Sequence, residues 1–115
     1  MTSSKTPETG GLGSFEEQVL LAVIRTGAEA YGMSVRRELE RVTGRSITIG
    51  SVYITLDRLE AKGLVESERT AAAADGPSRR VFTVTLAGGR ALADTRTVRD
   101  RLWEGVNLRT LLRNA

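Results

Sequence analysis

The side chains best suited to chemistry lie along one face of a helix predicted for residues 49–62. Short hydroxyl-bearing side chains come first on this face and cations come later; the residues are Ser51, Thr55, Arg58 and Lys62. Such a face suits the major groove of DNA, where small polar side chains meet base edges and cations meet phosphates. The same pattern on its own also fits an ordinary amphipathic surface helix.

The opposite face of this helix predicts packing against a core. Val52, Leu56 and Leu59 fall at i, i+4 and i+7, which is one stripe of an α-helix. Thr48 is placed to cap the first turn. Gly63 follows the last periodic residue and can adopt the left-handed conformation that ends a helix.

Two further helices are predicted upstream. Ser14 caps the first, and Glu17 three residues later completes a capping box. The second runs from about residue 30 to Gly44, with a charged outer face on which Arg and Glu mostly pair at helical spacing. Residues 45–48 favour a short strand.

Residues 64–86 predict a two-stranded hairpin. Phe82, Val84 and Leu86 alternate with polar or smaller residues, as in a half-buried strand, and a turn-forming run precedes them. Arg79 and Arg80 are expected near the hairpin tip, where paired arginines suit a minor-groove or phosphate contact. Exposed arginine pairs are also common where they serve only solubility.

The last predicted helix runs from about Leu86 towards Leu112, begins at a Thr85 cap and carries the only tryptophan, Trp103. A domain of this size cannot bury so long an apolar face, so a partner chain is its expected cover and the helix is interpreted as a dimerisation helix. Folding back on its own core is the alternative. Trp103 is a candidate wall for a flat ligand, or a packing residue.

Composition narrows the function classes. The 115 residues contain neither cysteine nor histidine, which excludes a disulfide framework, a Cys-based zinc site and Ser-His or Cys-His nucleophiles. No catalytic residues, metal site or cofactor are therefore predicted. The sequence shows no membrane-spanning run and no signal peptide, so no membrane association and a cytoplasmic location are expected.

The charge distribution is uneven. Residues 1–86 carry 11 Lys+Arg and 11 Asp+Glu, whereas residues 87–115 carry 6 Arg and 3 Asp+Glu, which accounts for the net charge of +3. A DNA-binding domain usually shows a basic footprint. Any such footprint must here be local.

These elements predict a mainly helical fold with a small β-hairpin, a winged helix-turn-helix with a three-helix core, a two-stranded wing and a C-terminal dimerisation helix. The expected divisions are a disordered tail at 1–13, a DNA-binding domain at 14–86 and the dimerisation helix at 87–115.

The spaced residues of the third helix and its end resemble the recognition-helix signature of PadR-like transcriptional regulators; they are Gly50, Tyr53, Leu56, Arg58, Leu59, Glu60, Gly63, Leu64 and Val65. A Tyr-Gly pair at 31–32, the Arg-Arg pair at 79–80 and Thr85 with Gly88 are similar to that family in order and spacing. The resemblance extends over about residues 12–92. It implies a homodimeric DNA-binding regulator, most often a repressor.

Carried onto this chain, the resemblance implies that Tyr53 lies near the DNA backbone, that Ser51, Thr55 and Arg58 face the groove, and that the wing contacts DNA through its two arginines. Ile49 and Ile54 depart from the family by standing where proline is frequent, and Gly89 replaces a polar or basic residue. Ile54 either touches a thymine methyl or belongs to the core.

The sequence thus predicts a repressor that binds a pseudo-palindromic operator in double-stranded DNA through residues 49–62 and the wing at 64–86. Release by a small-molecule effector and control by abundance alone both stay open. The alternative from another class is a winged-helix module that binds a protein, which the neutral charge of residues 1–86 favours.

Overall fold

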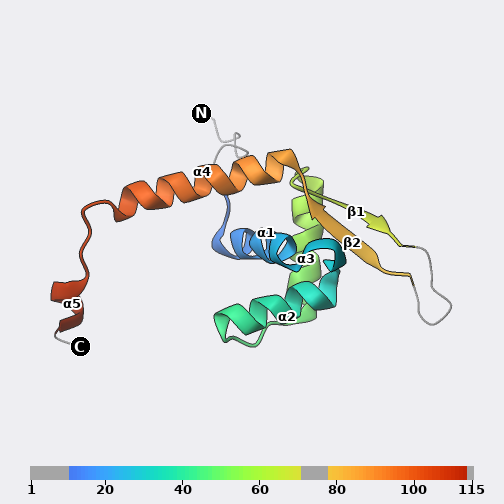
Figure 1. Cartoon of the computed structure of the whole chain (residues 1–115), viewed down its shortest axis with the longest axis horizontal. Coiled ribbons are helices and arrows are strands. Elements are labelled where there is room, and N and C mark those ends of the chain that lie inside the picture. Colours follow the sequence, from blue (N-terminus) through green and yellow to red (C-terminus); the bar gives the residue numbers. More distant parts are fainter. Residues whose placement is uncertain (1–10, 71–77, 114–115) are drawn as a thin grey trace.

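In the computed structural model, residues 11–70 and 78–113 are described, and three helices pack around an aliphatic core beside a two-stranded wing (Figure 1). The order of elements is α1 Ser14–Thr26, a 3-10 turn at Gly27–Glu29, α2 Gly32–Thr43, α3 Ile49–Ala61, β1 Val65–Arg69, β2 Arg80–Val84, α4 Leu86–Trp103 and α5 Arg109–Arg113. This is the predicted winged helix-turn-helix, with a further C-terminal helix.

The core is formed by the inner faces of all three body helices and by the wing. Its fully buried large side chains are Val19, Leu20, Val35, Val52, Leu56, Leu59, Val65 and Phe82. Phe82 enters from β2, and its backbone N–H donates to the Ala30 carbonyl at 2.8 Å. The wing is therefore attached to the body both by packing and by main-chain pairing.

The ends of α2 and α3 follow the sequence signals. Gly44 ends α2 with φ +71°, and Gly63 follows α3 with φ +77°. The Leu64 N–H donates to the Leu59 carbonyl and the Gly63 N–H to the Glu60 carbonyl, each at 2.9 Å. This pair of hydrogen bonds is a Schellman motif, and it turns the chain from α3 directly into β1.

The predicted cap of α1 is wrong by one residue. Gly13, rather than Ser14, is the N-cap, and the Glu16 carboxylate, rather than Glu17, accepts the hydrogen bond from the Gly13 N–H. Glu16 is also paired with Lys62 of α3, which holds it at this end of the helix. A tertiary contact therefore selects between two adjacent carboxylates.

The expected disorder of residues 1–10 lies outside the described residues. Gly11 to Gly13 are in place against α4, since the Leu12 N–H donates to Thr95 Oγ1 at 3.2 Å and the Leu12 side chain packs against the core. The prediction of a tail up to residue 13 is thus too long by these residues.

The predicted strand at 45–48 is absent, and these residues form an irregular link. The third partner of the hairpin is Tyr31, which forms an isolated antiparallel bridge with Val81. In the wing itself, β1 and β2 pair antiparallel with Val65 opposite Val84 and Arg69 opposite Arg80. Residues 71–77, most of the predicted turn, lie outside the described residues.

The long terminal helix is shorter than predicted. Leu86 is its first residue, exposed instead of lying on the strand face with Phe82, and the helix ends at Trp103. Gly105 with φ +76° separates it from α5. In Figure 1, α4 passes along the body and then leads the chain away from it to α5. None of the helices within residues 11–70 and 78–113 is long and apolar enough to cross a bilayer.

The C-terminal half of α4 does not fold back on the body. Leu92 is partly buried against the core, but every residue from Arg96 to Arg113 is exposed. The exposed apolar side chains in this segment are Val98, Leu102, Trp103, Val106, Leu108, Leu111 and Leu112. The single chain therefore leaves this face uncovered.

The first turn of α4 approaches the Leu64 backbone closely at Gly88, and substitutions there can test this contact. A Cβ added at Gly88 would lie 2.2 Å from the Leu64 carbonyl oxygen, whereas one at Gly89 would meet nothing within 4 Å. We expect Gly88→Ala to lower the free energy of unfolding by about 1–3 kcal/mol because the helix must shift away from the wing. Gly89→Ala is the matched control and should raise it by about 0.5–1 kcal/mol through helix propensity. Urea titrations measure both, and equal effects would contradict the close approach.

Candidate nucleic-acid interface

Helix α3 presents a single exposed stripe on the side away from the core. Its exposed members recur at i, i+3, i+4, i+7, i+8 and i+11, and they are Gly50, Tyr53, Ile54, Asp57, Arg58 and Ala61. The Thr48 hydroxyl accepts from the Ser51 N–H at 3.2 Å and caps the first turn, as predicted. The helix is thus anchored at both ends, with one face open to solvent.

Thr55 is not on this exposed face. Its side chain is 4% exposed and lies in the inner stripe with Val52 and Leu59, so the prediction that it faces outward is wrong. Position 55 is three residues after Val52 and four before Leu59, which places it on the core side of the helix. The sequence prediction placed Thr55 at the surface because its hydroxyl is polar, although its spacing from Val52 and Leu59 indicated the core side.

The other predicted α3 residues differ in how freely they face solvent. Arg58 is exposed, and none of the ion pairs among the described residues involves it. Ser51 is partly buried, and its hydroxyl donates to the Thr48 carbonyl at 2.9 Å. Lys62 is the C-cap of α3 and pairs with Glu16 at 2.8 Å. Arg58 is therefore the cation of α3 most available to an anionic partner.

Tyr53 is held against the start of α2. A Cβ added at Gly32 would lie 2.2 Å from Cζ of the Tyr53 ring, so only glycine admits the ring at this distance. This contact explains the Tyr-Gly pair in physical terms, because the glycine at 32 makes room for the tyrosine at 53. The Tyr53 side chain remains partly exposed beside the outer stripe.

A second group of cationic side chains surrounds Tyr31, which directly precedes Gly32 in the chain. The Arg79 guanidinium lies over the Tyr31 ring, 4.2 Å from its centroid, and Arg37 Nη2 donates to the Tyr31 hydroxyl at 3.2 Å. We call Tyr31, Arg37 and Arg79 the Tyr31 cluster. Sequence reasoning treated the charged residues of α2 as mostly paired with one another and missed Arg37, because no helical spacing connects positions 31 and 37.

Arg80 has a different role from Arg79. Its guanidinium pairs with Glu60 at 2.6 Å and Asp57 at 2.9 Å on α3, and its Nε donates to the Ser67 hydroxyl at 3.2 Å. The predicted exposure of Arg80 at the hairpin tip is wrong, because the side chain turns back from β2 onto α3 and also lies over the Phe82 ring. Arg79 precedes β2 and Arg80 is its first residue, and successive side chains of an extended chain point to opposite sides, which separates the two arginines.

The same contacts perturb Glu60. Hydrogen bonds from Arg80 and then from Ser67 lower the pKa of the Glu60 carboxyl from its usual value. The wing and α3 are therefore joined by a charged contact that is intact at neutral pH.

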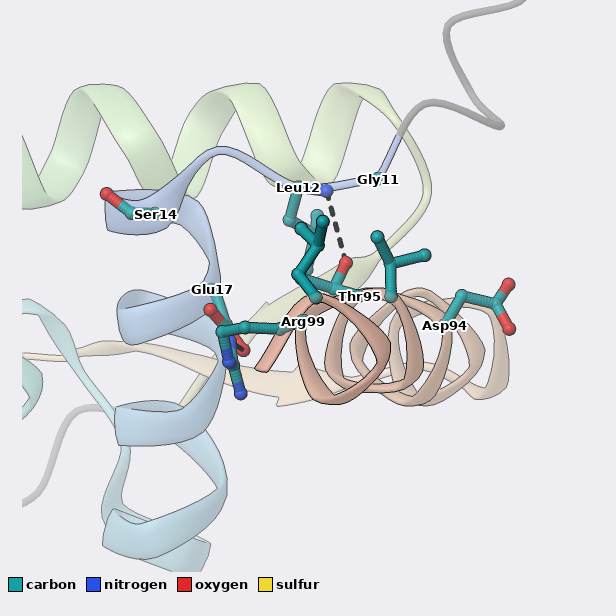
Figure 2. A pocket seen from close by; sticks show the side chains of 9 residues that line it. Gly11, Leu12, Ser14, Glu17, Asp94, Thr95 and Arg99 are labelled. Carbon is teal, nitrogen blue, oxygen red and sulfur yellow. Dashed lines mark hydrogen bonds and ion pairs between the residues drawn. The ribbon is translucent and has the colours of Figure 1, made fainter. Parts of the chain in front are cut away.

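A groove of about 340 Å³ lies between the N-terminal segment, α1 and α4 (Figure 2). Leu12, Val98 and Leu102 give it apolar walls, and Arg99 reaches across to pair with Glu17 on α1. Trp103 does not line this groove, and its side chain is 53% exposed at the end of α4. Its assignment to a ligand wall, like the small-molecule effector itself, stays a prediction.

Among residues 11–70 and 78–113, no group of three Asp or Glu side chains is placed to hold a metal ion. The interface has the character of a recognition surface. It consists of the outer stripe of α3, with Arg58 as its available cation, and the neighbouring Tyr31 cluster.

A three-helix body, a paired wing and a recognition-type helix with an open face define a winged helix-turn-helix regulator. The chain matches the Transcriptional regulator PadR-like family over residues 20–94. It is 40% identical over 74 residues to the Transcriptional regulator Rv3488 of Mycobacterium tuberculosis, a match that spans 64% of this chain and 66% of that relative. The chain belongs to the PadR-like family of transcriptional regulators.

Solved structures agree with this fold. A PadR-like transcription factor from Bacteroides fragilis superposes with a TM-score of 0.69 at 20% identity, covering 97% of this chain and 96% of that one. A PadR family regulator from Eggerthella lenta gives 0.64 at 26% identity, over 82% and 80% of the two chains. The match to the Bacteroides protein includes nearly all of this chain, so the C-terminal helices belong to the shared architecture.

The contact between Arg80 and α3 leads to a pH-dependent prediction. We expect Arg80→Ala to lower the free energy of unfolding by about 1 kcal/mol at pH 7, since the contact is partly exposed. The folded-state pKa of Glu60 is lowered, so this stabilisation is present above the unfolded-state value of about 4.3 and is lost as pH falls through the folded pKa. The difference between wild type and Arg80→Ala should therefore shrink between pH 5 and pH 3.

Arg79→Ala serves as the control for this measurement, because Arg79 stacks on Tyr31 and pairs with no carboxylate among the described residues. Its effect in denaturant titrations should not depend on pH over the same range. An Arg80→Ala cost that stays constant down to pH 3 would contradict the ion pair with Glu60.

Proposed function

We propose that this protein binds double-stranded DNA sequence-specifically, as a homodimer that represses transcription from a pseudo-palindromic operator. The observation that carries the proposal is the outer stripe of α3 beside the Tyr31 cluster. This helix is anchored, its outer face is open, and Arg58 on that face forms no ion pair within residues 11–70 and 78–113. Helix α3 would enter the major groove, and the wing would lie along the adjacent backbone.

The distribution of ion pairs supports a local basic footprint despite the neutral total. Six carboxylates of the body pair with nearby cations; they are Glu16, Glu17, Glu38, Glu40, Asp57 and Glu60. Arg37, Arg58 and Arg79 are in none of the ion pairs among the described residues. These three cations would supply the salt-dependent phosphate contacts.

The dimer would form through the uncovered apolar face that continues from the second half of α4 into α5. A monomer rarely leaves so long a run of apolar side chains in water, and a second copy offers the same face by two-fold symmetry. Two α3 helices related by that symmetry would read half-sites about 34–36 Å apart, one turn of the double helix.

A protein-binding winged helix is the second candidate. Glu66 and Glu68 are exposed on β1, outside the ion pairs found in residues 11–70 and 78–113, and they place negative charge on the wing. Such charge disfavours a wing laid on phosphates and favours a basic protein partner. No binding of any duplex, even at low salt, would favour this candidate over DNA.

Arg58→Ala tests the DNA interface. We expect it to weaken binding to an operator selected from random duplexes and to reduce the slope of log K against log salt by about 2, as for one lost phosphate contact in each half-site of the dimer. Arg41→Ala is the matched control, since Arg41 is also exposed but hydrogen-bonded to Glu38 on α2. Fluorescence anisotropy at several salt concentrations gives both values. Unchanged affinity and slope for Arg58→Ala would remove this residue from the interface.

Leu102→Glu tests the dimer without touching α3. A charge in the uncovered apolar face should convert the dimer to a monomer, because burying it between two chains is costly. Thr97→Glu is the control, since residue 97 lies roughly 140° around the helix from Leu102 at 3.6 residues per turn. Sedimentation velocity should show a dimer for wild type and control. A Leu102→Glu protein that sediments as the wild type would contradict the proposed dimer face.

A further inference from the structure

Ile54 occupies the middle of the outer stripe of α3. Its side chain is 60% exposed, so the alternative that it belongs to the core is excluded. The core side of the helix is already filled by Val52, Leu56 and Leu59, all fully buried. An aliphatic side chain thus stands at the centre of the face that the proposed function places against DNA.

The neighbours of Ile54 along the stripe are either small or engaged elsewhere. Tyr53 packs on the backbone of α2 at Gly32, and Asp57 pairs with Arg80 of the wing. Gly50, one turn earlier, has no side chain, and a Cβ there would meet nothing within 4 Å. Ile54 and Arg58 are consequently the stripe side chains left to reach outward, and a surface could approach closely around Ile54.

The chemistry of the two outward side chains differs. Arg58 can meet phosphates or acceptor atoms of bases, but Ile54 has no donor or acceptor. The apolar group that base pairs present in the major groove is the C5 methyl of thymine. A methyl at the same carbon of cytosine would offer the same contact. Side chains near the N-terminal part of a recognition helix are those that meet base edges, and Ile54 lies in the second turn of α3.

We propose that Ile54 is a specificity-determining residue that packs against the C5 methyl group of a pyrimidine in each operator half-site. The inference rests on the proposed DNA binding and adds what the helix reads. One methyl removed from water is worth about fourfold in affinity, so the contact in two symmetric half-sites is worth about fifteenfold.

The test starts from duplexes enriched by the full-length protein from a random library. In the best duplex, each symmetric pair of thymines is replaced by uracil, which removes the methyl and keeps the hydrogen-bonding pattern of the pair. Wild type and Ile54→Ala are titrated against each duplex. We expect one substitution to weaken wild type about fifteenfold and to leave the affinity of Ile54→Ala unchanged.

Two further arms sharpen the result. Each cytosine is replaced in turn by 5-methylcytosine, and a gain in affinity that Ile54→Ala lacks would assign the contact to methylated cytosine instead of thymine. Ile24→Ala is the matched variant, an isoleucine 52% exposed on α1, outside α3 and the wing. It should keep the full methyl discrimination of the wild type.

The outcomes are distinct. An enriched operator for which no methyl change distinguishes wild type from Ile54→Ala overturns the inference and leaves the proposed DNA binding intact. Failure to enrich any sequence overturns the proposed function and the inference together. Because Ile54 is exposed, its replacement by alanine should leave the fold unchanged, and a urea titration of the variant confirms this before binding is measured.

Discussion

One junction of hydrogen bonds around Thr85 connects the recognition helix, the wing and α4. The Thr85 hydroxyl donates to the Gly63 carbonyl at 2.7 Å, and the Thr85 N–H donates to the Leu64 carbonyl at 3.1 Å. The same hydroxyl accepts from the Gly88 N–H at 3.0 Å and caps α4. The end of α3, the base of the wing and the start of α4 therefore meet within a few residues. In the proposed dimer, this junction would fix the distance between two recognition helices, since α4 carries the symmetric contact.

Charge in this fold is used mainly within the chain. Arg80 joins β2 to α3, Lys62 joins α3 to α1, and Arg99 joins α4 to α1. Each of these contacts crosses between elements far apart in sequence, so their loss would loosen the frame more than an ion pair along a single helix would. Among the described cations outside these ion pairs, Arg58 lies on the α3 stripe, and Arg37 and Arg79 contact Tyr31. In the proposed function, these three would form a local basic surface on a body whose total charge is neutral.

Helix α4 divides into a half that packs against the core and a half that is joined to α1 by the Arg99–Glu17 pair but leaves its apolar side chains exposed. Its first turns pack against the wing and α1 through Gly88 and Leu92, and Thr95 receives the Leu12 N–H. From Arg96 to Arg113 the residues are exposed and largely apolar or cationic. The first half orients the second, so the direction of the uncovered face is set by contacts within one chain. This arrangement suits a rigid link between the two DNA-reading units of the proposed dimer.

Much of this structure could be predicted from local patterns. The inner stripe of α3, the Thr48 and Thr85 caps and the turn at Gly63 each depend on residues a few positions apart, and all are present as expected. The order of elements and the spaced motif also indicated the family, and the family match over residues 20–94 confirms it. The exposed position of Arg58 on α3 was likewise predictable from the helical period alone.

The remaining features depend on contacts between distant segments. Thr55 is buried because α3 turns that side to the core, and Arg80 leaves the solvent because two carboxylates of α3 lie within its reach. Gly13 rather than Ser14 caps α1 because Glu16 is held there by Lys62. The sequence by itself determined which segments form helices and where α2 and α3 end, since those depend on neighbouring residues. Only the tertiary structure decided which polar side chains face outward, because that depends on which segment packs against them.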